Sequence, residues 1–243
     1  MSRRLRALQA LGLTPLWVRR EAIDSRDFAL EEDEPGLAPG QPQLQAVARD
    51  RSADIRAMDW AQLKAAVAGC RACPLHERRR QAVFGVGDEQ ADWLFVGEGP
   101  GAEEDARGEP FVGQAGSLLD NMLAAIDLRR GQDVYIANVV KCRPPGNRTP
   151  EPAEVHACEP YLLRQIELIQ PKLIVALGKV AANKLLQTDA TLGSLRGRVH
   201  DFRGTPLIVT YHPAYLLRTL EDKAKAWEDL CFAVEEMQRL RQA

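Results

Sequence analysis

Four of the five cysteines in the chain have a spacing that could bind a metal centre. Cys70 and Cys73 form a C-x2-C pair, whereas Cys142 and Cys158 are separated by fifteen residues and lie far along the chain. In a chain without signs of secretion, such thiols favour metal binding over disulfides. The spacing is equally compatible with zinc and with an iron–sulfur cluster, because zinc usually takes two close pairs and four-cysteine clusters tolerate irregular spacing. Four unrelated buried thiols are the alternative, and Cys231 is expected in the core.

A glycine-rich turn followed by acids is a second candidate for ligand binding. Residues 97–101 read Gly-Glu-Gly-Pro-Gly and could bring backbone amides close to an anionic or carbonyl-rich ligand. The turn has neither the G-x-G-x-x-G spacing of dinucleotide sites nor the Gly-Lys-Ser/Thr of a P-loop, which disfavours a nucleotide cofactor. The acids at 103–105 and the Pro-Phe-Val-Gly segment at 110–113 follow, although these acids could equally form a solvated surface.

Two further segments combine polar and charged residues. Asn138 precedes a basic loop that continues to Arg148, and residues 211–218 bring His212, apolar side chains and Arg218 together. Basic loops are more often merely exposed, and a single histidine is more often structural. The interest of these residues therefore depends on where the fold places them.

Apolar runs predict the elements that position these residues. Strands are expected at 93–97, 134–140, 173–177 and 207–211, and helices at 117–126, 152–169, 179–186 and 223–240. This alternation predicts an α/β domain of three α/β/α layers around a central, mainly parallel four-stranded sheet. In such a sheet, ligands bind beyond the carboxyl ends of the strands, where the unusual residues lie.

Composition limits the class of protein but does not identify a partner. The 243 residues are 45% hydrophobic and 27% charged, which is enough for one main domain and an extension. The net charge of −2 does not indicate a nucleic-acid partner. Residues 1–20 predict an amphipathic helix, with a targeting peptide as the alternative, and 30–49 predict a polar linker. We therefore divide the chain into an extension at 1–55 and a domain at 56–243.

From about residue 59 to 237 the chain resembles family 4 uracil-DNA glycosylases. The resemblance rests on ordered motifs: the C-x2-C pair, the GEGPG turn, PFVG, an asparagine followed by VVKCRPPGNR, a further cysteine and HPA. It implies removal of uracil from DNA in base excision repair, with a 4Fe–4S cluster. It assigns this cluster to four cysteines: Cys70, Cys73, Cys142 and Cys158.

The resemblance also implies how uracil would be recognised after the nucleotide flips out of the DNA stack. Phe111 would stack on the base. The Asn138 amide would pair with uracil N3–H and O4, and would mismatch the exocyclic amine of cytosine. Glu104 would lie near uracil C5 and exclude the methyl group of thymine.

Bond cleavage would need donors aimed at uracil O2, because negative charge develops on the leaving base. His212 is the expected donor, helped by the turn at Gly97, Glu98 and Gly99. Glu98 is the candidate for positioning the attacking water. DNA phosphates are expected to contact Arg143, Arg148 and Arg218. The gap left by the flipped nucleotide is expected to be filled by Tyr215, Leu216 or Leu217. The alternative for Leu216 and Leu217 is that they begin a buried helix.

Two rival functions remain at this point. One is a uracil-DNA binder that traps DNA covalently through a histidine on a basic insertion, which residues 138–158 lack. The other is a non-catalytic, zinc-stabilised nucleic-acid-binding domain. We expect a monomer with no membrane segment, in the bacterial cytoplasm and associated with the nucleoid, whose extension has an unidentified partner.

Overall fold

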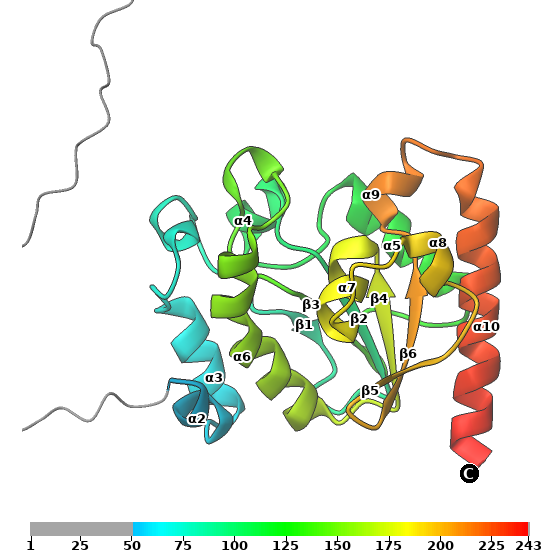
Figure 1. Cartoon of the computed structure of the whole chain (residues 1–243), viewed down its shortest axis with the longest axis horizontal. Helices are drawn as coiled ribbons and strands as arrows, with labels where there is room; N and C mark the ends of the chain where they lie inside the picture. The colour runs from blue at the N-terminus through cyan, green and yellow to red at the C-terminus, as the bar shows by residue number, and fades with distance from the viewer. Residues whose placement is uncertain (1–50, 243) are drawn as a thin grey trace, which may run out of the picture. The chain divides into compact units, whose positions relative to one another are not determined.

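The computed structural model describes residues 51–242. They form a six-stranded sheet of order β1-β3-β2-β4-β6-β5 with helices around it (Figure 1). The four central strands are parallel: β3 (Val134–Asn138), β2 (Trp93–Gly97), β4 (Leu173–Leu177) and β6 (Thr205–Thr210). Two short strands pair antiparallel at the edges: β1 (Val86–Gly87) and β5 (His200–Phe202). The predicted α/β fold with four central parallel strands is confirmed, and the two edge strands are additions.

The predicted helix at 1–20 and linker at 30–49 lie outside the described residues. The expected boundary between residues 55 and 56 falls inside helix α2 (Arg51–Arg56), whose Ile55 is buried in the core. No helix of the part that the structure describes is long and apolar enough to span a membrane.

The central strands are apolar because both of their faces are covered. Every residue of β2, β3 and β4 is buried, as expected for parallel strands between two helical layers. The strand predicted at 134–140 ends at Asn138, but Val139 and Val140 still donate backbone hydrogen bonds to the carbonyls of Gly97 and Glu98. The last residues of β2 and β3 are thereby held side by side.

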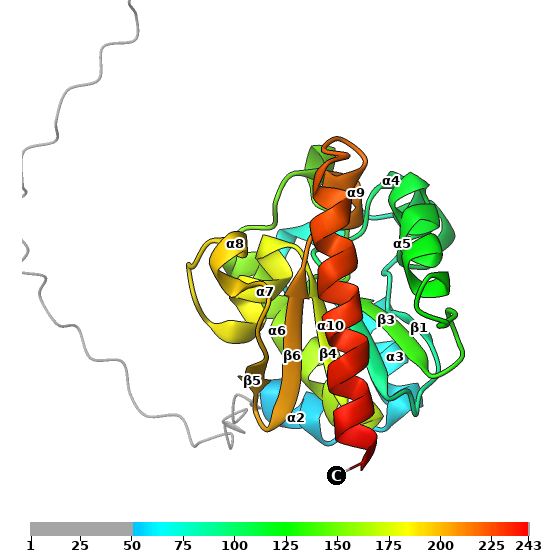
Figure 2. The ribbon, with the colours of Figure 1, turned by 90° about the vertical axis from the view of Figure 1, so that its right-hand side faces the viewer.

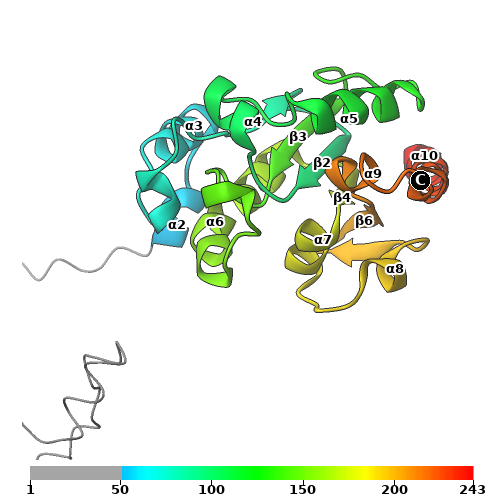
Figure 3. The same ribbon diagram turned by 90° about the horizontal axis from the view of Figure 1, so that it is seen from above.

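Helices form the outer two layers (Figures 2 and 3). One face of the sheet packs against α2, α3 (Trp60–Ala68), α6 (Pro152–Ile169), α7 (Lys179–Leu186) and α8 (Leu192–Leu195). The other face packs against α5 (Gln114–Ala124) and α10 (Asp222–Gln242). The predicted three layers are therefore confirmed.

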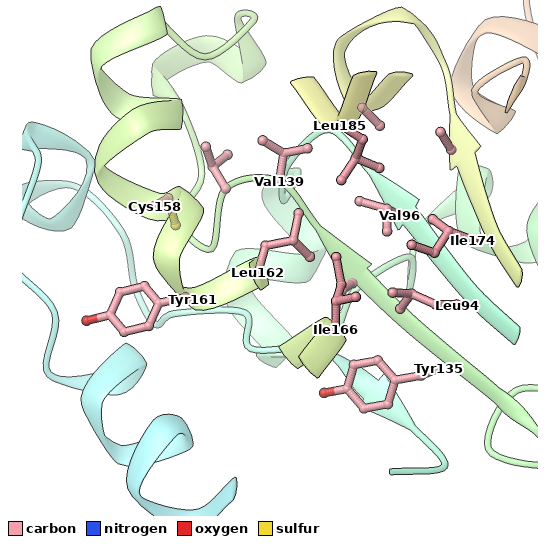
Figure 4. Close-up of a cluster of buried hydrophobic side chains, with 14 of the residues drawn as sticks. Leu94, Val96, Tyr135, Val139, Cys158, Tyr161, Leu162, Ile166, Ile174 and Leu185 are labelled. Atoms are coloured by element: carbon pink, nitrogen blue, oxygen red, sulfur yellow. The ribbon is translucent and has the colours of Figure 1, made fainter. Parts of the chain in front are cut away.

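Helix α6 connects the sheet to the cysteine-bearing side of the domain. Its Leu162 and Ile166 point toward the sheet, whereas Tyr161 points toward α2 and α3 (Figure 4). Pro152 occupies the first turn and Glu154 accepts the backbone N–H of Glu151, so the start of the helix is well defined. The helix thus fixes where its remaining side chains lie.

Short elements at the carboxyl edge of the sheet were not predicted. They are α4 (Ala102–Arg107), α9 (Pro213–Leu216) and the 3-10 turns η1 (Pro74–Glu77) and η2 (Pro145–Asn147). Each has six residues or fewer, which is too short for a periodic apolar pattern. Their positions decide the shape of the candidate site.

We expect Leu94→Ala to lower the free energy of unfolding by about 2–5 kcal/mol. Leu94 is fully buried in β2, so the truncation leaves a cavity between the sheet and α6. Urea denaturation measures the change. Leu220→Ala is the matched control, because Leu220 is 61% exposed and its loss should alter stability by less than about 0.5 kcal/mol. Equal effects of the two variants would contradict this packing.

Candidate active site

A cavity of about 490 Å³ opens at the carboxyl edge of the parallel strands. It lies between the ends of β2 and β3, helix α4, the loop after β3 and helix α9. The predicted residues that line it are Glu98, Gly99, Glu104, Phe111, Asn138, Arg148, His212, Tyr215 and Arg218. Gly97, Arg143 and Leu216 do not line it. The fold therefore brings together residues that are more than a hundred positions apart.

Asn138 and Gly97 form the floor of this site. The side chain of Asn138 is buried, and its Oδ1 atom has no hydrogen-bond partner among the described residues. Gly97 is its register partner on β2, and a Cβ there would lie 2.5 Å from both Asn138 Oδ1 and Phe111 Cζ. Gly97 thus makes room for other residues instead of lining the cavity itself. A buried acceptor without a partner is well suited to a ligand N–H.

Glu104 is held rigidly at the cavity wall. Its Oε1 accepts the backbone N–H groups of Val112 and Gly113 at 2.9 and 3.2 Å, and its Oε2 accepts that of Gly101 at 3.1 Å. The carboxylate therefore ties the glycine-rich turn to the loop that carries Phe111. Three backbone donors restrict its movement, so it can act as a fixed wall.

His212 is neutral at physiological pH. Burial lowers the pKa of His212 to about 4, the charge of Arg218 acts in the same direction, and Glu104 partly opposes both. The Nδ1 atom accepts the backbone N–H of Ala214 at 3.1 Å, so the single proton of the neutral ring is on Nε2. The ring also stacks on Phe111, with centroids 5.5 Å apart and planes at 30°. This arrangement presents a neutral N–H donor.

The carboxyl group of Glu98 is partly buried and therefore less hydrated than an exposed one. Burial raises the pKa of Glu98, and a hydrogen bond with the Thr149 side chain partly opposes the shift. Both residues line the cavity. Thr149 was missed from the sequence because nothing in the spacing connects it to the turn at 97–101.

The basic loop after β3 is partly neutralised by its own neighbours. Arg148 pairs with both carboxylate oxygens of Glu154 at 2.7 and 2.8 Å, and with Glu151 at 3.2 Å. Arg143 donates to Asn147 Oδ1 at 2.7 Å. The Arg148 guanidinium is therefore already engaged with two carboxylates, which weakens the expectation that it grips phosphate.

The expectation that Leu216 contacts DNA is corrected by the structure. Leu216 is 1% exposed and packs with Met122, Ala226 and Leu230 beneath α9. Its neighbours Tyr215 and Leu217 are 36% and 39% exposed. One turn of helix therefore turns Leu216 inward and leaves the two flanking side chains at the surface.

The four predicted cysteines line one small cavity between η1, the segment after β3 and α6. Arg79 Nη1 donates to Cys142 Sγ at 2.9 Å, and the backbone N–H of Lys141 donates to Cys158 Sγ at 3.3 Å. Burial raises the pKa of Cys158 to about 12. A thiolate at that position therefore needs strong positive charge nearby, as a metal centre would provide.

Lys141 connects this cavity to the active-site floor. Its side chain is only 1% exposed, which is rare for a lysine. Its Nζ donates to the Asn138 carbonyl at 2.9 Å and to Gln165 Oε1 at 2.5 Å, and burial lowers the pKa of Lys141 to about 8. The two sites therefore share one strand end.

Comparison with known proteins agrees with this arrangement. The Uracil DNA glycosylase superfamily matches residues 84–231. A type-4 uracil-DNA glycosylase of Archaeoglobus fulgidus is 48% identical over 159 residues, covering 62% of this chain and 79% of the relative. Type-4 uracil-DNA glycosylases of Pyrobaculum aerophilum and Thermotoga maritima are 44% and 48% identical, covering 71% and 64% of this chain and 92% and 82% of the relatives. The chain therefore belongs to the uracil DNA glycosylase superfamily, within its type-4 group.

Proposed function

We propose that this protein hydrolyses the N-glycosidic bond of uracil in DNA and leaves an abasic site, as the first step of base excision repair. The observation that carries the proposal is the unpaired, buried Oδ1 of Asn138 in the same cavity as the neutral His212. An acceptor for a base N–H and a donor for a base carbonyl are then available together. Uracil, with N3–H between two carbonyls, matches that pair.

Recognition takes place after the nucleotide flips out of the DNA. The base stacks on Phe111, and Asn138 pairs with N3–H and O4. Cytosine lacks the N3–H and carries an amine instead of O4, so it leaves the Asn138 amide mispaired. Glu104, fixed by three backbone amides, lies close to uracil C5 and excludes the methyl group of thymine.

Bond cleavage leaves negative charge on the base, and the site stabilises it with neutral donors. His212 donates from Nε2 to uracil O2, because its Nδ1 is engaged by Ala214. The turn at Gly97, Glu98 and Gly99 adds backbone dipoles close to the same charge. Donors fixed before the reaction lower the barrier without needing to reorient during it.

The attacking water is positioned by Glu98. The carboxyl group lies beside Thr149 at the cavity wall, and burial raises its pKa above the ordinary value. Such a group accepts a proton from water more readily than an exposed carboxylate. Two carboxyl groups of the described residues line the cavity: backbone amides of neighbouring loops hold Glu104, whereas none within residues 51–242 holds Glu98.

DNA is held around the mouth of the cavity. Arg218 lines it and has no ion pair within the part of the chain that the structure describes, so it is free to bind a phosphate. Arg143 contributes from the loop after β3. Tyr215, with Leu217 as the exposed alternative, fills the gap left by the flipped nucleotide. Arg148 mainly holds the loop against Glu154.

Cys70, Cys73, Cys142 and Cys158 bind a 4Fe–4S cluster. Their thiols line one cavity, and Arg79 and the Lys141 amide donate toward the sulfurs. A 4Fe–4S cluster takes four cysteine thiolates, one at each iron, so four cysteines around one cavity suit it. The cluster, when bound, would connect η1, the end of β3 and α6 and so stabilise this side of the domain.

We also propose that the protein is a monomer in the bacterial cytoplasm, associated with the nucleoid.

Strand cleavage at a single uracil in a labelled oligonucleotide, after alkali, tests the proposed reaction. We expect Asn138→Ala and His212→Ala each to lower the rate by roughly two orders of magnitude, since each removes a group that contacts the base. Asn121→Ala and His156→Ala are matched controls at exposed positions and should behave as wild type. Wild-type protein that retains DNA covalently without releasing uracil would instead establish a trapping binder.

The charge state of His212 is open to direct measurement. We expect its imidazole to remain neutral at pH 5.5, because the pKa of about 4 lies well below that pH. Long-range ¹⁵N NMR, with His212→Gln for assignment, reports the protonation state. An unfolded histidine protonates near pH 6.5, so the contribution of His212 to stability is lost as pH falls from about 6.5 toward 4. Titration near pH 6.5 in the folded protein would overturn the neutral-donor mechanism.

Iron content tests the cluster. We expect wild-type protein to contain about four irons per chain, absorb in the visible region, and lose both with Cys142→Ser. Cys231→Ser is the control and should keep the iron, because Cys231 does not line the cysteine cavity. We also expect a lower Tm for Cys142→Ser, as the tie between its segments is lost. Stoichiometric zinc in a colourless wild-type protein would contradict the cluster.

A further inference from the structure

Phe111 has an unusual backbone conformation for a bulky residue. Its φ angle is 56°, in the left-handed region that glycine and asparagine adopt more readily. The residue lies between α4 and α5 in the loop that Glu104 anchors. A phenylalanine remains in this conformation only where its surroundings hold it there, and such positions are frequent in functional sites.

Arg130 contacts this part of the loop through two short hydrogen bonds. Its Nη1 donates to the Pro110 carbonyl at 2.6 Å, and its Nη2 donates to the Phe111 carbonyl at 2.8 Å. The guanidinium is oriented by Asp120 of α5, whose Oδ1 accepts from Nε at 3.1 Å and from Nη2 at 3.0 Å. One planar side chain therefore holds two consecutive carbonyls and is itself held by a carboxylate.

Two glycines make this arrangement possible. Gly116 of α5 packs directly against the Phe111 carbonyl, since a Cβ at Gly116 would lie 1.8 Å from that oxygen. Gly131, with φ at 80°, allows the tight turn between Arg129 and Gln132 that presents Arg130. The backbone around Phe111 is thus fixed from two sides.

This backbone conformation determines where the Phe111 ring lies. Phe111 is 6% exposed, and its ring packs on the backbone of Gly97 and stacks on His212 with centroids 5.5 Å apart. It also lines the cavity. A change of φ at Phe111 to the ordinary negative range would carry the ring away from these neighbours.

We propose that Arg130 is a positioning residue, which, together with Asp120, holds Phe111 in the left-handed conformation that places its ring against the flipped base. The proposal rests on the proposed function, because it assigns Phe111 to uracil stacking. A planar guanidinium fits the role because its fork can bind two carbonyls at once, whereas the ammonium of a lysine is a point charge without a fixed fork.

The test compares four proteins under single-turnover conditions: wild type, Arg130→Ala, Phe111→Ala and the double variant. We expect Arg130→Ala and Phe111→Ala each to slow uracil release by roughly 10-fold, the size of effect expected when one base–aromatic stack is lost. If Arg130 acts through Phe111, the double variant is as slow as Phe111→Ala alone. Arg129→Ala, at an exposed neighbouring position, is the control and keeps the wild-type rate.

Two further readouts separate positioning from general loss of structure. Binding to DNA that carries an abasic-site analogue should be unchanged in Arg130→Ala, because that DNA has no base to stack on Phe111. The His212 ring signals in NMR should shift similarly in Arg130→Ala and Phe111→Ala, because both remove the stacked ring. Arg130→Lys should retain part of the activity, and it replaces Arg130→Ala in every measurement if the alanine variant does not fold.

Several outcomes would overturn the proposal. They are a wild-type rate and unchanged His212 signals in Arg130→Ala, additive effects in the double variant, or an equal loss of affinity for abasic DNA. Failure of the proposed function is distinct, since wild-type protein would then release no uracil. The His212 signals would still report in that case whether Arg130 holds the Phe111 ring.

Discussion

Two parallel strands end side by side at the floor of the cavity, and the space between their last residues decides what can bind there. The register of β2 and β3 places Gly97 beside Asn138. Because Gly97 has no Cβ, the Asn138 amide and the Phe111 ring both lie close to the Gly97 backbone. The Cβ of any other residue at position 97 would occupy that space. The loops that carry Phe111 and His212 are then arranged around this gap.

Polar groups near the gap are fixed by partners that leave selected atoms free. Ala214 engages Nδ1 of His212 and leaves Nε2, and three amides hold Glu104 in place. Lys141 donates a hydrogen bond to the backbone carbonyl of Asn138, while the side-chain Oδ1 of Asn138 stays unpaired. The low dielectric of the buried site makes such unpaired atoms costly in the free protein, and correspondingly favourable for a ligand that satisfies them.

Lys141 also connects the cavity to the cysteine site, because Asn138, Lys141 and Cys142 lie on one short segment of the chain. Its side chain contacts the end of β3, its backbone amide donates to Cys158, and the next residue is Cys142. A structural cluster at these cysteines would therefore stabilise the same segment that positions Asn138. The segment can serve both sites because its backbone is hydrogen-bonded to the last residue of β2 and to the residue after it.

The sequence by itself determined the four central strands, the main helices and most of the residues at the cavity, since apolar runs and strand-end polar residues are local signals. It could not reveal β1 and β5, which have two and three residues. Only the tertiary structure decided that Leu216 is buried, that Arg148 is paired with Glu154, and that Arg130 holds Phe111. Each of these depends on partners from other elements, and no spacing along the chain encodes which distant group a side chain will meet.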